Sequence, residues 1–479
     1  MGKLKNTGLI SLGVIAGVAA SLQFSAMAQK QVDPALPLEE LRQLADVFGL
    51  IKSDYVEPIE DKKLLTDAIS GMVASLDPHS AYLDKVAYAE LREDSQGKFV
   101  GLGIEIGLSE DGYIKIVSPI EDSPAYRAGI KAGDLITRLD GTPVKGLSLD
   151  ESIKKMRGEP GTKVSLTIAR KDAPKPLVFV ITREEIHQKS VKAKMVEPGY
   201  AWLRVAQFQE PTVDDLAAKI TELYKQDPHL KGLVLDLRND PGGMLQGAIG
   251  VSAAFLPKDV AIVTTNGQLP ESKQIFYGRA EYYALRSEGD ALAKLPTEVK
   301  KVPMVVLVNT GSASASEIVA GALQDYKRAI ILGSQTFGKG SVQTIRQLTA
   351  DTAVKLTTAR YYTPKGRSIQ AKGIVPDLLV DENADGDGLN SLRTREADLE
   401  KHLSNDRDKE AAKNIRDEAE DELRIVAAEK RRKPLEYGSK DDFQLTQALN
   451  HLKGFPVQLA KAEPKIVQVN DPKKPDEKK

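Results

Sequence analysis

The residues best suited to chemistry lie in the segment 310–318, Thr-Gly-Ser-Ala-Ser-Ala-Ser-Glu-Ile. It follows the apolar run 302–309, so the pattern predicts a strand, a turn of small residues and a helix that begins just after Ser314. Small side chains let a substrate backbone approach, and the first N–H groups of a helix have no partner within it. Such a turn can hold a nucleophilic hydroxyl beside an oxyanion hole, although a serine that only caps the helix explains it equally well. Residue types alone do not choose among Ser312, Ser314 and Ser316.

A second candidate is Lys339, which lies between two glycines in the segment 337–340, after a predicted strand at 330–332. Burial disfavours an ammonium group and lowers its pKa, and a neutral lysine can accept the proton of a serine hydroxyl. Ser–Lys pairs replace the Ser–His–Asp triad in some hydrolases. Taken alone, Lys339 fits a solvated loop lysine better, so the hypothesis depends on the serine turn.

Other chemistries have less support. The chain has no Cys, which excludes a thiol nucleophile, a Cys-ligated zinc and a disulfide framework. Its histidines lie outside both motifs without metal-ligand spacing, and we expect no metal or cofactor; they are His79, His187, His229, His402 and His451. Residues 333–339 match the start of a phosphate-binding loop, but Gly340 replaces the Ser or Thr that would bind Mg²⁺.

The elements that position these residues follow from periodicity. Residues 198–380 alternate apolar strands with amphipathic helices, which indicates an α/β layer with a largely buried sheet. The predicted strands are 202–206, 232–237, 302–308 and 330–332, and the predicted helices are 212–225 and 315–325. Residues 97–183 consist instead of short β-like runs between Gly, Pro and Asp turns, which predicts a compact β-rich module.

Both ends of the chain differ from this middle part. Residues 38–92 show helical periodicity, and residues 391–433 carry 12 acidic and 12 basic side chains, which fits a solvated helix or an assembly helix equally well. A further helix is predicted over 443–452. Residues 1–28 are typical of a secretory signal, with cleavage after Ala28, which predicts a periplasmic protein; an uncleaved anchor is the alternative. The balance of 67 basic and 68 acidic residues argues against nucleic-acid binding.

Several motifs in order resemble the carboxyl-terminal processing peptidases, which are tail-specific, PDZ-containing serine proteases. The similarity covers roughly residues 40–380. In the predicted protease part it rests on Leu235–Gly243, Thr310–Leu323, Phe337–Gly340 with Val342-Gln343, Thr358–Gln370 and Gly373–Asp377. In the β-rich module it rests on Phe99–Ile106, Ser123–Ala125 and Ala128–Ile136.

The resemblance implies an α+β multidomain protein, with a ClpP/crotonase-like α/β protease core, an inserted PDZ domain and helical flanks at both ends. The expected parts are a signal peptide at 1–28, a helical region at 38–95, the PDZ domain at 97–185, the protease core at 190–380, a charged helical region at 381–455 and a flexible tail at 456–479.

By resemblance, Ser314 is the nucleophile, Lys339 the general base, and Gln343, about one helical turn further on, orients the Lys amine. The backbone N–H groups of Gly243 and Ala315 form the oxyanion hole. Carboxylate binding in the PDZ domain is assigned to the loop Gly101, Leu102, Gly103 and Ile104. Arg157 is a possible regulatory contact to the catalytic region.

These assignments predict an exported serine endopeptidase that recognises substrate C-termini through its PDZ domain. The expected partners are proteins with accessible C-termini and further copies of the chain, and an adaptor protein is a further candidate. A non-catalytic PDZ scaffold on a protease-like fold is the alternative, and the intact Ser314, Lys339 and Gln343 argue against it.

Overall fold

The computed structural model describes residues 36–109, 111–120, 122–171, 173–284, 289–384, 393–407 and 435–460. The predicted signal peptide, most of the charged segment 391–433 and the end of the tail lie outside these residues. The chain divides into two compact units between Gly71 and Met72. In the described residues, no helix combines the length and apolarity that crossing a membrane requires.

The first unit contains α2 (Leu38–Asp54) and most of α3 (Asp61–Ala74). Glu39 and Glu40 in the first turn of α2 and Lys52 in its last turn complement the helix dipole. None of the described side chains of α2 is buried. Its exposed apolar residues follow helical spacing, and they are Leu38, Leu41, Leu44, Val47 and Leu50.

The centre of the second unit is a sheet with the strand order β10-β11-β12-β15-β16-β19. These strands are β10 (Val191–Glu197), β11 (Tyr200–Val205), β12 (Gly232–Asp236), β15 (Met304–Val308), β16 (Ile330–Gly333) and β19 (Leu378–Leu379). β10 is antiparallel to β11, and the later pairs are parallel. Every residue of β12 and β15 is buried, as expected for parallel strands covered on both faces.

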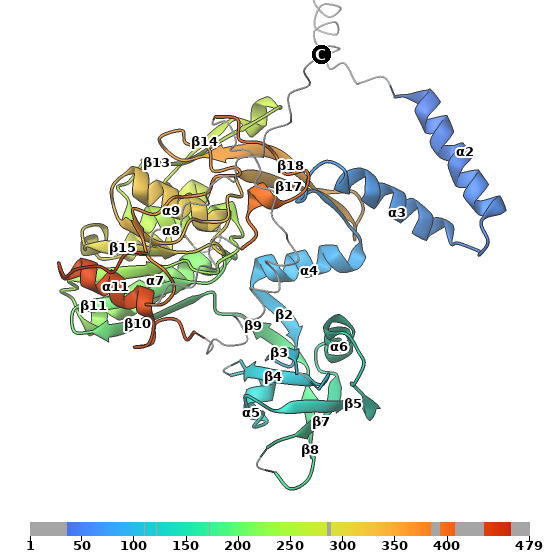
Figure 1. Cartoon of the computed structure of the whole chain (residues 1–479), viewed down its shortest axis with the longest axis horizontal. Coiled ribbons are helices and arrows are strands. Elements are labelled where there is room, and N and C mark those ends of the chain that lie inside the picture. The colour runs from blue at the N-terminus through green and yellow to red at the C-terminus, as the bar shows by residue number, and fades with distance from the viewer. Residues whose placement is uncertain are drawn as a thin grey trace, which may run out of the picture. The chain divides into compact units, whose positions relative to one another are not determined.

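Side chains alternate between the two faces of this sheet. Leu235 and Val306 share one hydrophobic cluster with α7 (Thr212–Gln226), α8 (Leu245–Phe255) and α9 (Ala315–Asp325). Val234 and Val305 point the other way, into a cluster with α11 (Phe443–Leu452), which has the bounds predicted from the sequence. Figure 1 shows α8 and α9 side by side against the sheet. The carboxyl ends of β12 and β15 therefore meet at one edge, where the predicted chemistry lies.

A second, antiparallel sheet has the order β1-β18-β13-β14, with β17 also pairing with β18. Its strands are β1 (Ala81–Leu83), β13 (Ala261–Gly267), β14 (Gln274–Tyr277), β17 (Ser341–Gln347) and β18 (Ala353–Tyr362). The sequence placed Gln343 about one helical turn beyond Lys339, and this is wrong. Gln343 belongs to β17, next to an irregularity in the pairing with β18, so strand geometry sets its position.

The β-rich module, which is the expected PDZ domain, follows α4 (Lys85–Gln96) and is connected through the ribbon of β2 (Lys98–Gly101) and β9 (Glu184–His187), as Figure 1 shows. Its sheet has the order β3-β4-β5-β7-β8, with β6 paired to β5. The elements are β3 (Ile104–Leu108), β4 (Ile114–Pro119), α5 (Pro124–Arg127), β5 (Leu135–Leu139), β6 (Thr142–Pro143), α6 (Leu149–Met156), β7 (Lys163–Ala169) and β8 (Leu177–Thr182). Ile116, Ile136 and Leu166 belong to a buried cluster of its own.

Short 3₁₀ helices complete the second unit, and they are η1 (Pro270–Ser272), η2 (Ala280–Tyr282), η3 (Ala291–Lys294), η4 (Thr297–Lys300) and η5 (Glu396–Asp398). Separate α/β and β-rich parts joined in one chain confirm the expected α+β multidomain class.

Candidate active site

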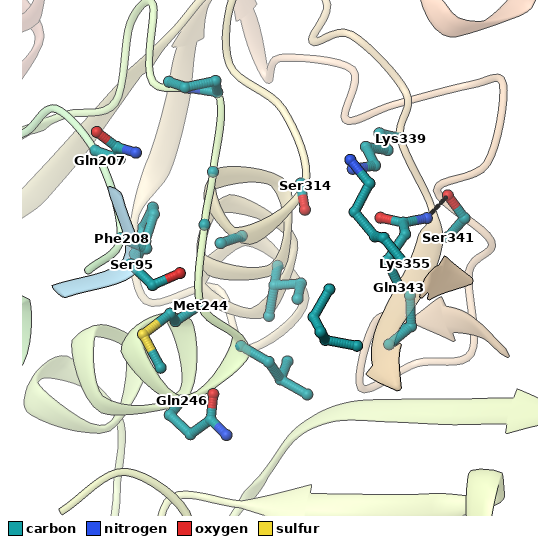
Figure 2. Close-up of a pocket in the computed structure, with 18 of the residues that line it drawn as sticks. Ser95, Gln207, Phe208, Met244, Gln246, Ser314, Lys339, Ser341, Gln343 and Lys355 are labelled. Atoms are coloured by element: carbon teal, nitrogen blue, oxygen red, sulfur yellow. Dashed lines mark hydrogen bonds between the residues drawn. The ribbon is translucent and has the colours of Figure 1, made fainter. Parts of the chain in front are cut away.

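A cavity of about 650 Å³ lies at the carboxyl ends of β12 and β15. It is lined by the predicted catalytic and oxyanion residues, which are Gly243, Ser314, Ala315, Lys339 and Gln343. Figure 2 shows Ser314 with Phe208 and Met244 to one side of it and Lys339 and Gln343 to the other. Phe208 and Gln343, 135 positions apart in the sequence, thus border one space.

Ser314 differs from the neighbouring serines. Its backbone has φ +57° and ψ −113°, a region that non-Gly residues rarely adopt, and its side chain makes no capping hydrogen bond to α9. Ser312 donates to the Leu237 carbonyl over 2.7 Å, and Ser316 donates to the Asp240 carbonyl over 2.9 Å. Both of those serines are buried, and their hydroxyls are engaged in these hydrogen bonds. The structure therefore separates the three serines, which residue types alone could not do.

The glycine loop, residues 240–243, lies against the Ser314 turn. Gly242 has φ +97°, and a Cβ there would lie 2.7 Å from both the Ala313 carbonyl oxygen and the Ser314 Cβ. Gly243 has φ +138°, and a Cβ there would lie 2.1 Å from the Phe208 carbonyl oxygen. Only glycine fits both positions.

Two backbone donors remain available at this turn. Among the described residues, no group accepts a hydrogen bond from the N–H of Gly243 or from that of Ala315. Ala315 is the first residue of α9, where backbone donors have no partner within the helix. Both residues line the cavity, so these N–H groups can bind a developing negative charge on an oxygen near Ser314.

Lys339 enters the cavity from a loop that its glycines make possible. Gly338 has φ +101°, and a Cβ on Gly340 would lie 2.3 Å from the Gln370 backbone nitrogen. Burial lowers the pKa of the Lys339 ammonium below its usual 10.5, and the positive charge of Lys355 lowers it further. Three carboxylates raise it in part, and these are Glu396, Glu317 and Asp77. The net effect is a lowered pKa for Lys339, which favours the neutral amine.

Gln343 is held by the neighbouring strand. Its amide nitrogen donates to Ser341 Oγ over 3.0 Å and to Thr357 Oγ1 over 3.1 Å. Thr357 in turn donates to Asp77 Oδ1 over 3.1 Å. Within the described part of the chain, Gln343 makes no hydrogen bond to Lys339, although both line the cavity.

Glu317 is a functional candidate that sequence reasoning missed. Its buried carboxylate accepts the backbone N–H of Ser314 over 2.8 Å and that of Lys339 over 2.9 Å. It also accepts from Gly338 N–H over 2.8 Å and Thr336 Oγ1 over 2.5 Å. Burial raises the pKa of Glu317 to about 7. A Glu three residues after a Ser at a helix start has capping-box spacing, and this signal could have found it.

Two more side chains of this cavity were not predicted. Tyr361 is buried, and its hydroxyl donates to the Lys339 carbonyl oxygen. Lys355 comes from β18, where it pairs with Ile345 of β17. Neither has a local sequence signature, because the pairing of β17 with β18 is what brings them to the cavity.

The predicted PDZ residues form a separate groove. Gly101, Leu102, Gly103 and Ile104 line a cavity of about 150 Å³ together with Ile153, Met156 and Arg157. The lining is apolar apart from Arg157 and backbone groups, which suits an apolar C-terminal side chain with its carboxylate. Gly103 has φ +74°, and a Cβ there would lie 2.1 Å from the Ser123 Cβ.

Arg157 does not contact the predicted catalytic residues directly. Its guanidinium lies 3.2 Å from Glu93 and 3.6 Å from Glu90, both on α4. The same helix contributes Leu91 and Asp94 to the lining of the larger cavity. Arg157 thus contacts α4, and α4 in turn lines the larger cavity.

Three protein-family models match the chain. Peptidase family S41 matches residues 199–380, a PDZ domain model matches residues 115–170, and the N-terminal domain of the activating protease CtpB matches residues 15–87.

Relatives are similar over most of the chain. A carboxy-terminal-processing protease from Bartonella bacilliformis is 44% identical over 375 residues, which is 77% of this chain and 82% of that protein. A probable CtpA-like serine protease from Staphylococcus aureus is 39% identical over 342 residues, 71% of this chain and 65% of that protein. Among solved structures, the photosystem II D1 C-terminal processing protease is 32% identical, with a TM-score of 0.41 over 71% of this chain and 86% of that one.

Proposed function

This chain belongs to the carboxy-terminal-processing serine proteases of peptidase family S41, and on that premise we propose that it hydrolyses peptide bonds with a Ser314–Lys339 dyad. The observation that carries the proposal is one cavity that is lined by Ser314, by Lys339 with its lowered pKa and by two available backbone donors. No metal or cofactor enters the proposed chemistry.

In the proposed first step, the neutral Lys339 amine takes the proton of the Ser314 hydroxyl, and Ser314 Oγ attacks the substrate carbonyl carbon. The resulting oxyanion accepts hydrogen bonds from the N–H groups of Gly243 and Ala315. Lys339 then gives its proton to the leaving amine as the peptide bond breaks. Water hydrolyses the acyl-enzyme with Lys339 again acting as the base, which restores Ser314.

We assign substrate capture to the groove of the PDZ domain. A peptide C-terminus would add as a strand at the sheet edge, with its carboxylate at the backbone of the 101–104 loop and its last side chain against Ile153 and Met156. The contact of Arg157 with α4 supports a link between this groove and the cavity. The proposed enzyme is therefore an endopeptidase directed to protein tails.

Export and assembly belong to the same proposal. The pattern of residues 1–28 supports secretion to the periplasm with cleavage after Ala28. The exposed apolar stripe of α2 supports contact with a further copy of the chain or with an adaptor protein. Removal of residues 29–71 should then reduce the oligomer size measured by light scattering, and an unchanged size would contradict this part.

The test of the activity compares the mature protein with Ser314→Ala, Lys339→Ala and the neighbour control Ser312→Ala. The substrate is an unfolded protein with an apolar C-terminus. We expect Ser314→Ala and Lys339→Ala to lose at least about 10³-fold in rate. Equal rates for wild type and Ser314→Ala would refute the protease function and favour the PDZ scaffold. Amidation of the substrate C-terminus should weaken cleavage, and no effect would refute tail capture.

A further inference from the structure

Asp240 is a fully buried carboxyl group to which the proposed mechanism gives no role. It is the first residue of the glycine loop, which lies between β12 and the turn of Ser314. Its Oδ1 accepts the N–H of Gly242 over 2.8 Å. Its backbone carbonyl accepts the N–H of Ala313 over 3.0 Å and the hydroxyl of Ser316 over 2.9 Å. Asp240 thus ties the loop that carries Gly243 to the segment that carries Ser314.

The second carboxyl oxygen of Asp240 has no partner. Oδ2 is buried, and no group of the described residues donates to it. No cation of the described residues lies within ion-pair distance either. The charges that act on it are those of Arg204, whose guanidinium donates to Asp236 over 3.3 Å, and of Asp236 itself. Arg238 binds Asp236 and Asp442. A negative charge on Asp240 therefore has little local compensation.

A buried carboxyl with this environment is stabilised as the neutral acid. Burial is the main cause that raises the pKa of Asp240, to about 8, and Asp236 adds to it. The hydrogen bond from Gly242, the nearby Ser316 hydroxyl and the charge of Arg204 act in the opposite direction. In neutral solution the proton thus stays on the carboxyl.

We propose that Asp240 is a positioning residue of the oxyanion hole, which holds the glycine loop as a neutral carboxylic acid and weakens the hole when it ionises. The inference rests on the proposed use of the Gly243 and Ala315 N–H groups. In the neutral acid, Oδ1 accepts a hydrogen bond from the N–H of Gly242 and holds that residue in place. The conformation of Gly242 then sets the direction of the Gly243 N–H. An ionised carboxylate keeps the hydrogen bond but places a negative charge on the loop whose N–H groups must stabilise an oxygen that becomes negative.

The two buried groups then limit activity from opposite sides. Lys339 must lose its proton to act as the base, so kcat/KM rises with pH as its amine becomes neutral. Asp240 must keep its proton, so kcat/KM falls as pH rises through about 8. The pH profile is a bell, and its alkaline limb belongs to Asp240.

The test measures kcat/KM for a peptide from pH 6 to 10 with mature wild type, Asp240→Asn and Asp240→Ala. Asn is a neutral isostere, so Asp240→Asn should keep the plateau within about threefold and move the alkaline limb up by at least one pH unit. Asp240→Ala removes the acceptor of Gly242 and should lower kcat tenfold or more, with KM little changed. Asp441→Asn, at an exposed neighbour of α11, should behave as wild type.

Ser316→Ala provides an independent variant should Asp240→Asn fail to fold. It removes a hydroxyl that donates to the Asp240 backbone carbonyl and whose nearby dipole favours the ionised carboxylate, so the alkaline limb should again move to higher pH. An alkaline limb at the wild-type position in the folded variants, or full activity in Asp240→Ala, would overturn the inference. Such a result with an inactive Ser314→Ala would leave the protease function intact, whereas an active Ser314→Ala would refute both.

Discussion

Glu317 Oε2 accepts the backbone N–H of Lys339 over 2.9 Å, so the helix that follows Ser314 holds the loop of the proposed base. The same oxygen accepts a hydrogen bond from the N–H of Ser314, and this bond helps to hold the strained backbone conformation of Ser314. One buried carboxylate thus sets the backbone positions of both members of the dyad.

Replacement of Glu317 by Gln should disrupt this arrangement. Each carboxyl oxygen accepts two hydrogen bonds, so the amide nitrogen of Gln would face donors wherever it points. We expect a loss of about 1–3 kcal/mol in the free energy of unfolding and a kcat reduced at least about tenfold. Urea unfolding and peptide hydrolysis measure the two effects. The exposed Glu271→Gln is the matched control. A Glu317→Gln enzyme with the wild-type kcat and stability would contradict the proposed role of Glu317.

Removal of the positive charge of Lys355 should raise the pKa of Lys339. Lys355 lines the same cavity and disfavours a second cation there. In Lys355→Gln, Lys339 would therefore hold its proton to higher pH, and the acid limb of kcat/KM would move up. Each unit of such a shift costs about tenfold on that limb. The exposed Lys301→Gln serves as the control. An acid limb at the wild-type position, or at lower pH, would show that Lys355 does not influence the base.

The sequence predicted the elements around the site more fully than the contacts within it. The bounds of α9 and α11 follow from local periodicity, which a single segment contains. The position of Gln343 depends on the pairing of β17 with β18, and a helical interpretation of the same residues was wrong. Ser314 could be separated from Ser312 and Ser316 only by resemblance, because the partners of those hydroxyls come from the segment 237–240.

Glycine positions offer a direct test of the geometry beside the proposed nucleophile, Ser314. A Cβ on Gly242 would meet Ser314 Cβ and the Ala313 carbonyl oxygen, so Gly242→Ala should displace Ser314. We expect kcat to fall by about 10² or more. Gly366 has a similar positive φ of +77° with open space around it, so Gly366→Ala reports the backbone strain alone, about 1–2 kcal/mol. Equal kcat for both variants would argue against a crowded turn at Ser314.

The buried pair of Arg238 and Asp442 joins the sheet edge to α11, across 204 positions of sequence. Asp442 contacts the guanidinium through both oxygens, over 2.9 and 2.6 Å, and also caps α11 by accepting the N–H of Leu445 over 3.1 Å. Asp236 binds the same guanidinium over 2.5 Å, and Arg238 is only 1% exposed.

In Asp442→Asn the cap can remain while one charge partner is lost. Breaking a buried ion pair from one side costs about 3–5 kcal/mol, and because Asp236 still binds Arg238 we expect about 3 kcal/mol in urea unfolding. The exposed Asp441→Asn should change stability by less than about 0.5 kcal/mol. Arg238 comes two residues before Asp240, so the loss should also loosen the glycine loop and lower kcat. A destabilised variant with unchanged kcat would separate α11 from the active site, and unchanged stability would show that Asp236 alone compensates the buried arginine.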